Sequence, residues 1–214
     1  MHDLITIETG TSPVVVASPH SGMSAPGIAT RLVERNGDPY ATSLARHVAR
    51  LAEGSFIGTR MSRLWCDVCQ PPDSRATDPA HAAIPTIDRT GARIYGPNGE
   101  PDDPERGRRL TVLYRPWHEL TDMLQRLAVE RHGRGILLET HSHRDGDPFR
   151  VEGDLTAMRL AKSLGDLTET PVTVRAEGHD ADRARVRLSV RTDLLCDPAM
   201  ADRVARTVAQ AVGA

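Results

Sequence analysis

Two apolar runs, each followed by a histidine and a serine, constrain the fold of this chain more than any other feature. The first is Val14–Ser18, with His20 two residues beyond it, and the second begins at Gly135 and leads to His141. Short apolar runs of this kind are typical of strands buried on both faces of a parallel sheet. Ligands of open α/β sheets bind beyond the carboxyl ends of the strands. We therefore expect His20 and His141 to lie at one edge of a sheet, as two sides of one site.

The remaining pattern alternates between strands and helices. Asp38-Pro39 is a helix-start signal, with Asp38 as the N-cap, and Pro116 should kink or split a long helix near Tyr114. This order predicts one α/β domain over residues 1–214, with a mixed, mainly parallel sheet and helices on both faces. We expect strands at 4–8, 14–18, 55–59, 64–68, 93–95, 135–142, 172–175 and 186–190, helices at 39–53, 102–132, 154–164 and 198–212, and polar loops at 71–100 and 144–153.

Composition excludes several classes of protein. The formal net charge of −2 gives no electrostatic footprint for nucleic acid or an anionic membrane, and no apolar stretch approaches the roughly 18–20 residues of a membrane span. We find no signal peptide, and three cysteines fit a reducing cytosol. Cys66 and Cys69 form a C-x-x-C pair that we interpret as strand residues. We expect a soluble cytoplasmic protein whose partner is a small-molecule substrate. The sequence makes no prediction of oligomeric state.

The two histidines suggest a metal site. A catalytic zinc usually takes three protein ligands and water, and two histidines with one carboxylate form a common set. Asp38 is the best third ligand, although its N-cap role competes for the same oxygens. The alternative is that His20 and His141 are core or capping histidines. Glu139 lies two residues before His141, and it is either a hydrogen-bond partner of a ligand or the general base.

Several motifs together resemble those of the N-formylglutamate amidohydrolase family. The resemblance extends from about residue 13 to 143 and is weaker beyond. It implies an α/β/α sandwich like that of the zinc exopeptidases, with one catalytic zinc held by His20, Asp38 and His141. The motifs, in the family's order, are Ser18-Pro19-His20-Ser21-Gly22, Asp38, Ser62-Arg63 with Asp67, Gly91 to Tyr95, Tyr114-Arg115-Pro116-Trp117-His118 and Glu139-Thr140-His141-Ser142.

The resemblance implies zinc-dependent hydrolysis of an N-acyl amino acid or a similar small amide. Zinc polarises the carbonyl, and a carboxylate takes a proton from water. We expect Arg63 to contact the substrate or the oxyanion. His118, Ser142 and His179 are further candidates for substrate binding. For His118, a hydrogen bond to the helix backbone at the kink is an equal alternative.

Two departures from the family pattern bear on the chemistry. Gln70 stands where the family has an arginine, the natural partner of a substrate carboxylate, so we expect poor activity on N-formylglutamate. Ser189 stands where the final core strand carries a glutamate, the expected general base. Either Glu139 or Glu177 has taken over as base, or the alignment is shifted near the C-terminus. Otherwise the chain is a catalytically weak or inactive relative that binds a metal or small ligand.

Overall fold

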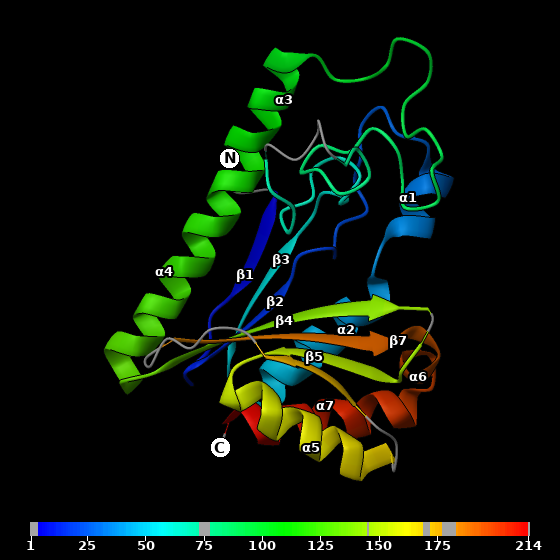
Figure 1. The fold of residues 1–214 in the computed structure, drawn as a ribbon. Coiled ribbons are helices and arrows are strands. Elements are labelled where there is room, and N and C mark those ends of the chain that lie inside the picture. Colours follow the sequence, from blue (N-terminus) through cyan, green and yellow to red (C-terminus); the bar gives the residue numbers. More distant parts are fainter. Residues whose placement is uncertain (1–3, 73–77, 145, 169–171, 177–182, 214) are drawn as a thin grey trace. The chain divides into compact units, whose positions relative to one another are not determined.

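A computed structural model describes residues 4–72, 78–144, 146–168, 172–176 and 183–213 of the 214-residue chain. Figure 1 shows the path of the chain through its helices and strands. Among these described residues, no helix is long and apolar enough to cross a membrane. The elements are β1 (Ile5–Glu8), β2 (Val14–Ser18), α1 (Thr30–Asn36), α2 (Pro39–Leu51), β3 (Ser55–Thr59), α3 (Asp103–Arg109), η2 (Leu110–Tyr114), α4 (Arg115–His132), β4 (Gly135–His143), β5 (Phe149–Gly153), α5 (Leu155–Thr168), β6 (Thr173–Ala176), β7 (Arg183–Arg191), α6 (Thr192–Cys196) and α7 (Pro198–Gly213).

The strands form one seven-stranded sheet in the order β1-β3-β2-β4-β7-β5-β6. The pairs β2–β4, β4–β7 and β5–β6 are parallel, and β5 runs antiparallel to β7. The register opposes Ala17 to Glu139 and His141 to Ser189. The predicted α/β fold with a mixed, mainly parallel sheet is confirmed.

The chain divides into two compact units, each built from three segments that alternate along the sequence. The first comprises Met1–Thr6, Pro19–Gly37 and Gly58–Leu120, and the second comprises Ile7–Ser18, Asp38–Ile57 and Thr121–Ala214. The expectation of a single domain over 1–214 stays a prediction.

The second unit carries the main core, with helices on both faces of its strands. Val14 and Val16 of β2 point into one apolar cluster, to which α2, α5 and α7 contribute. The opposite face includes Val15, which lines a small cavity of about 200 Å³ together with residues of α4 such as Leu124 and Ala128. Successive residues of β2 point to opposite faces of the sheet, and both faces are buried. This explains the continuous apolar run in the sequence.

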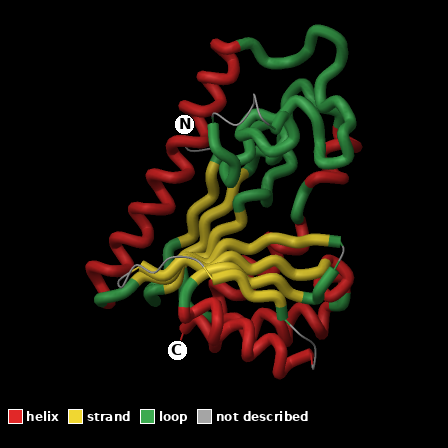
Figure 2. The backbone as a smooth tube through the Cα atoms, viewed as in Figure 1, coloured by secondary structure: helices red, strands yellow, loops and turns green. Residues whose placement is uncertain are grey.

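The first unit is dominated by irregular backbone. Between β3 and α3 the described residues form turns, bends and isolated bridges and no regular strand or helix, drawn as loops in Figure 2. The predicted strand at 64–68 is wrong, because most of these residues form turns. Ser62 Oγ accepts a hydrogen bond from the Leu64 backbone N–H, and Asp67 Oδ1 accepts one from Cys69. The predicted strand at 93–95 is also wrong, since only Arg93 forms a single bridge, to Ile87. Hydrogen bonds from the backbone to side chains, such as those accepted by Ser62 and Asp67, favour turns over the regular ladder of a strand.

The helix signals give a mixed outcome. Pro116 interrupts the long helix as expected, since a π-helical stretch, Leu110–Tyr114, directly precedes α4. Proline lacks an N–H and its ring crowds the preceding turn, so regular α-helix cannot continue through it unchanged. Gly165 does not end α5, which continues to Thr168. The polar loop predicted at 144–153 contains strand β5, whose two polar residues alternate with buried ones.

Candidate functional site

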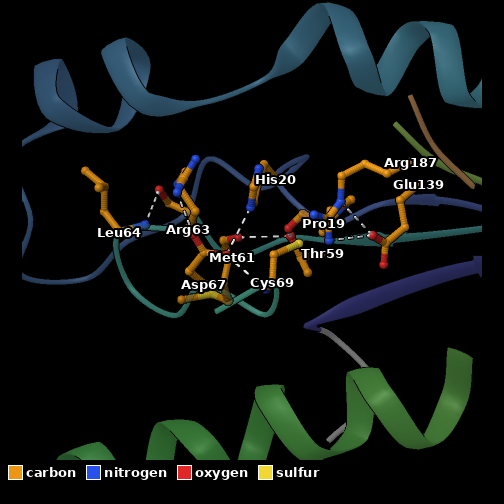
Figure 3. Close-up of polar contacts among 11 residues, drawn as sticks. Pro19, His20, Thr59, Met61, Arg63, Leu64, Asp67, Cys69, Glu139 and Arg187 are labelled. Atoms are coloured by element: carbon orange, nitrogen blue, oxygen red, sulfur yellow. Dashed lines mark hydrogen bonds and ion pairs between the residues drawn. The ribbon is translucent and has the colours of Figure 1, made fainter. Parts of the chain in front are cut away.

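A buried carboxylate joins the first histidine to an arginine in the first unit. Asp67 Oδ1 lies 3.0 Å from His20 Nε2, and Arg63 donates to Asp67 Oδ2 at 2.6 Å. The Cys69 backbone N–H adds a third hydrogen bond to Asp67. His20, Arg63 and Asp67 are all buried, and Figure 3 shows their side chains converging. The arrangement fixes the orientation of the His20 ring.

The charge state of Asp67 follows from its partners. Burial alone would raise the pKa of this carboxyl, but the charges of His20 and Arg63, with the hydrogen bonds of His20 and of the Cys69 backbone N–H, hold the pKa well below its usual range. Asp67 is therefore an ionised acceptor for the His20 N–H. Ligand histidines commonly donate their second N–H to such a carboxylate, which fixes the ring for metal binding.

The two cysteines of the C-x-x-C pair differ in their surroundings, since Cys66 is buried and Cys69 is partly exposed. No disulfide joins the three cysteines of the chain. Burial, together with the nearby charge of Asp67, raises the pKa of the Cys66 thiol to about 12, so this residue is a neutral core side chain. Cys69 is closer to the site, because its sulfur lies within 4.8 Å of ligand atoms of His20 and Asp67.

The other two proposed ligands meet in the second unit. Asp38 immediately precedes α2, but its side chain makes no capping hydrogen bond to the helix. Its Oδ1 instead accepts a hydrogen bond of 3.0 Å from Ser142 Oγ at the end of β4. A carboxylate oxygen of Asp38 also lies within 4.8 Å of a ring nitrogen of His141. The competing N-cap role is therefore not used, and the carboxylate is directed to the end of β4.

The donor atoms of the three proposed ligands are of the types that zinc prefers. Asp38 and His141 offer one carboxylate oxygen and one imidazole nitrogen at a separation that two ligands of one ion can adopt. His20 offers a second imidazole whose Nε2 is oriented by Asp67. The Ser142 hydroxyl orients the Asp38 carboxylate by donating a hydrogen bond to it. Residues that orient a metal's ligands are a common part of such sites.

Glu139 is clamped by two arginines from the neighbouring strand β7. Arg185 donates to its Oε1 at 2.7 Å, and Arg187 donates to its Oε2 at 3.3 Å (Figure 3 shows Glu139 with Arg187). Burial opposes ionisation of Glu139, but Arg185, His141 and Arg187 together lower its pKa. Such a carboxylate is a weak proton acceptor. The sequence analysis missed both arginines, although their alternate spacing in β7 was a visible signal.

The remaining predicted residues fall in different places. His118 lies in α4, and its ring centroid is 4.5 Å from that of Tyr114. Ser142 lies beside Asp38, as described above. Ser189 lies on β7, opposite His141 in the register. Glu177 and His179 lie outside the described residues.

Comparison with known proteins decides the family. The sequence model of N-formylglutamate amidohydrolase matches residues 12–214. The chain belongs to the N-formylglutamate amidohydrolase family. A relative, the N-formylglutamate deformylase of Pseudomonas putida, is 25% identical over 191 residues, which are 83% of this chain and 69% of that protein.

Two solved structures share the fold. The N-formylglutamate amidohydrolase of Ralstonia eutropha JMP134 superposes with a TM-score of 0.76 at 20% identity, over 98% of this chain and 95% of that one. A gene product of Agrobacterium tumefaciens gives a TM-score of 0.74 at 20% identity, over 99% and 94% of the two chains. The family model, which matches residues 12–214, confirms the family suggested by the sequence motifs, and the two solved structures show that the fold is shared over nearly the whole chain.

Proposed function

We propose that this amidohydrolase-family chain is a zinc-dependent enzyme that hydrolyses an N-acyl amino acid or a similar small amide. The observation that carries the proposal is the pair formed by Asp38 and His141, within 4.8 Å of each other at the end of β4. His20 is the third zinc ligand in this proposal. Chain connectivity supports it, because His20 follows β2 by two residues and β2 pairs in parallel with β4.

The orientation of His20 supports the same ligand set. Its Nε2 lies against Asp67, so zinc would be bound through Nδ1. A zinc ion held by these residues would supply Lewis-acid chemistry, polarising the amide carbonyl and lowering the pKa of bound water. Arg63 is buried with its guanidinium on Asp67. In this proposal Arg63 and Asp67 are positioning residues that hold His20. Substrate contacts are left to the more exposed Ser142 and His118, and to His179.

The general base in this proposal is Glu177. Glu139 has two arginine partners and a lowered pKa, and a proton acceptor at neutral pH works best with a pKa near 7. Glu139 instead fixes β7 next to β4. Glu177→Gln should lower kcat at least about a hundredfold, the usual contribution of a positioned base. An unchanged kcat would remove Glu177 from the mechanism.

A second candidate is a relative of the family that binds zinc without appreciable turnover. The feature that favours it is Ser189, which the sequence resemblance places where the family carries a glutamate, because serine cannot act as a base unaided. Gln70 points the same way, because an amide cannot neutralise a substrate carboxylate. In this candidate the ligand set is retained and the reaction is lost.

Zinc content and turnover, measured on the same preparation, separate the two candidates. The purified chain is loaded with zinc, and release of amino acid from a panel of N-formyl and N-acetyl amino acids is followed with fluorescamine. His141→Ala should lose both zinc and turnover. The matched control is His143→Ala, two residues further along β4, where Nε2 contacts the Asp147 carbonyl at 2.8 Å. Zinc binding without turnover favours the second candidate. A chain that takes up no zinc and shows no turnover refutes both candidates.

We infer that the protein acts in the cytoplasm, because three cysteines that form no disulfide suit a reducing compartment.

A further inference from the structure

The second unit contains a cavity at the opposite end of its strands from the proposed metal ligands. The cavity has a volume of about 200 Å³ and lies between α4 and the start of β2. Because β2 and β4 are parallel, with Val14 opposite Ile136, both strands begin at this end. Asp38 and His141 meet instead at the other end of β4. The cavity is therefore separate from these two proposed ligands.

Apolar side chains form one wall of the cavity. They come from Val15 of β2 and from Leu124, Leu127 and Ala128 of α4. The three helix residues and Arg131 recur at intervals that place them on one face of α4. An apolar cavity of about 150 Å³ is large enough to bind benzene. This cavity can therefore hold a compact apolar group of similar size.

Two serine hydroxyls also line the cavity, and each already accepts a hydrogen bond. Ser55 Oγ accepts from the Gly10 backbone N–H at 3.0 Å, and Ser12 Oγ accepts from the Val14 N–H at 3.3 Å. Within the described parts of the chain, neither hydroxyl has an acceptor for its own hydrogen. Ser55 is only 9% exposed, and a buried donor without an acceptor costs free energy. An acceptor inside the cavity would remove this cost.

The charged groups of the cavity are positive. Of the described residues that line it, only Arg131 and His132 are titratable, and both are exposed in the last turn of α4. Neither side chain forms a hydrogen bond or an ion pair with another described residue. The acidic residues close in sequence, Glu8, Glu53 and Glu130, are not among the lining residues. The full charge of Arg131 exceeds the partial negative charge at the end of a helix, which is roughly half a unit.

We propose that this cavity binds a small monocarboxylate with a compact apolar group, of about the size of benzoate. The apolar group lies against Val15 and the apolar face of α4. The carboxylate, which only accepts hydrogen bonds, takes the hydrogens of Ser12 and Ser55 and pairs with the Arg131 guanidinium. A neutral amide of the same shape is a poorer ligand, because it cannot pair with that charge. The inference does not depend on the proposed zinc chemistry, since no proposed metal ligand lines the cavity.

A titration followed by NMR of the methyl groups tests the proposal on the zinc-free full chain, in which benzoate cannot bind through a metal. The cavity is lined by methyl groups of Val15, Leu124, Leu127 and Ala128, and benzoate should shift their signals saturably. Benzoate should bind about fivefold more tightly than benzamide, because Arg131 is exposed and ion pairs in solvent are weak. Acetate should bind more weakly than benzoate, since it lacks the apolar ring.

Two results of this titration would overturn the proposal. Equal affinities for benzoate and benzamide would show that the site does not recognise a carboxylate. Methyl signals of the cavity that stay unshifted at tens of millimolar benzoate would show that the cavity holds water only.

Variants locate the site. Ala128→Leu should abolish binding, because the larger side chain fills part of the cavity, and Ser55→Ala should weaken benzoate binding several-fold. Arg131→Gln should remove the preference for benzoate over benzamide. The matched control is Arg126→Gln, an exposed arginine of α4 that pairs with Asp122 and does not line the cavity, and it should leave the preference unchanged. A preference retained in Arg131→Gln refutes the assignment even where Ala128→Leu fails to fold.

Discussion

Replacement of Asp67 by asparagine should destabilise the protein strongly. The substitution keeps the shape of the side chain and removes a buried charge that binds His20 at 3.0 Å and Arg63 at 2.6 Å. Arg63 is only 7% exposed, so its guanidinium would lose its counter-charge inside the protein. Breaking a buried pair by removing one partner typically costs about 3–5 kcal/mol. We expect a loss of that size in the free energy of unfolding of Asp67→Asn.

Urea unfolding at pH 7, followed by circular dichroism, measures this loss. The matched control is Asp202→Asn on α7, where the carboxylate pairs with Arg206 in solvent, and an exposed pair contributes at most about 1 kcal/mol. A double-mutant cycle with Arg63→Gln should give a coupling of about 1 kcal/mol or more between Asp67 and Arg63. Zinc affinity of Asp67→Asn should also fall about 10- to 100-fold. A loss of stability no larger than that of the control would refute the proposed role of the buried pair.

Three further predictions concern reactivity, acid stability and backbone conformation. The Cys66 thiol, whose pKa is raised to about 12 by burial and by Asp67, should not react with DTNB in the native protein at pH 8, whereas exposed Cys196 should react; a native titre of three thiols would contradict this. Burial opposes ionisation of Asp67 and Asp88, yet ion pairs and hydrogen bonds hold both pKa values below the usual range. The unfolded chain therefore takes up protons first as the pH falls below about 4, and the free energy of unfolding in urea should be lower at pH 3 than at pH 7; equal values would show that these carboxylates do not act in this way. Gly153→Ala should destabilise the fold by more than about 1 kcal/mol, because φ is +145° and an added Cβ would lie 2.4 Å from the Arg185 carbonyl oxygen; an unchanged melting temperature would contradict it.

The sequence predicted the features that depend on local pattern. The two apolar runs are neighbouring parallel strands, β2 and β4, because residues buried on both faces produce a continuous apolar run. The interruption of the helix before Pro116 follows from the missing N–H of proline. Asp38 was identified as a residue at the start of a helix with two competing roles, and the structure directs its side chain to Ser142.

The features that the sequence analysis missed depend on contacts between distant residues. Asp67 and His20 are 47 positions apart, and no periodicity connects them. The arginine clamp on Glu139 joins β4 to β7 through a strand pairing that the pattern did not specify. The apolar residues at 64–68 were assigned to a strand because burial of a turn produces the same hydrophobic signal as burial of a strand.

The most direct test of the account is a crystal structure of the zinc-loaded protein with anomalous data at the zinc edge. We predict one strong anomalous peak, about 2.0–2.1 Å from His20 Nδ1 and from a ring nitrogen of His141, and about 2.0–2.2 Å from an oxygen of Asp38. The Asp67 carboxylate should remain on His20 Nε2. A peak bound by other residues, or no peak in crystals grown with excess zinc, would contradict the proposed metal centre.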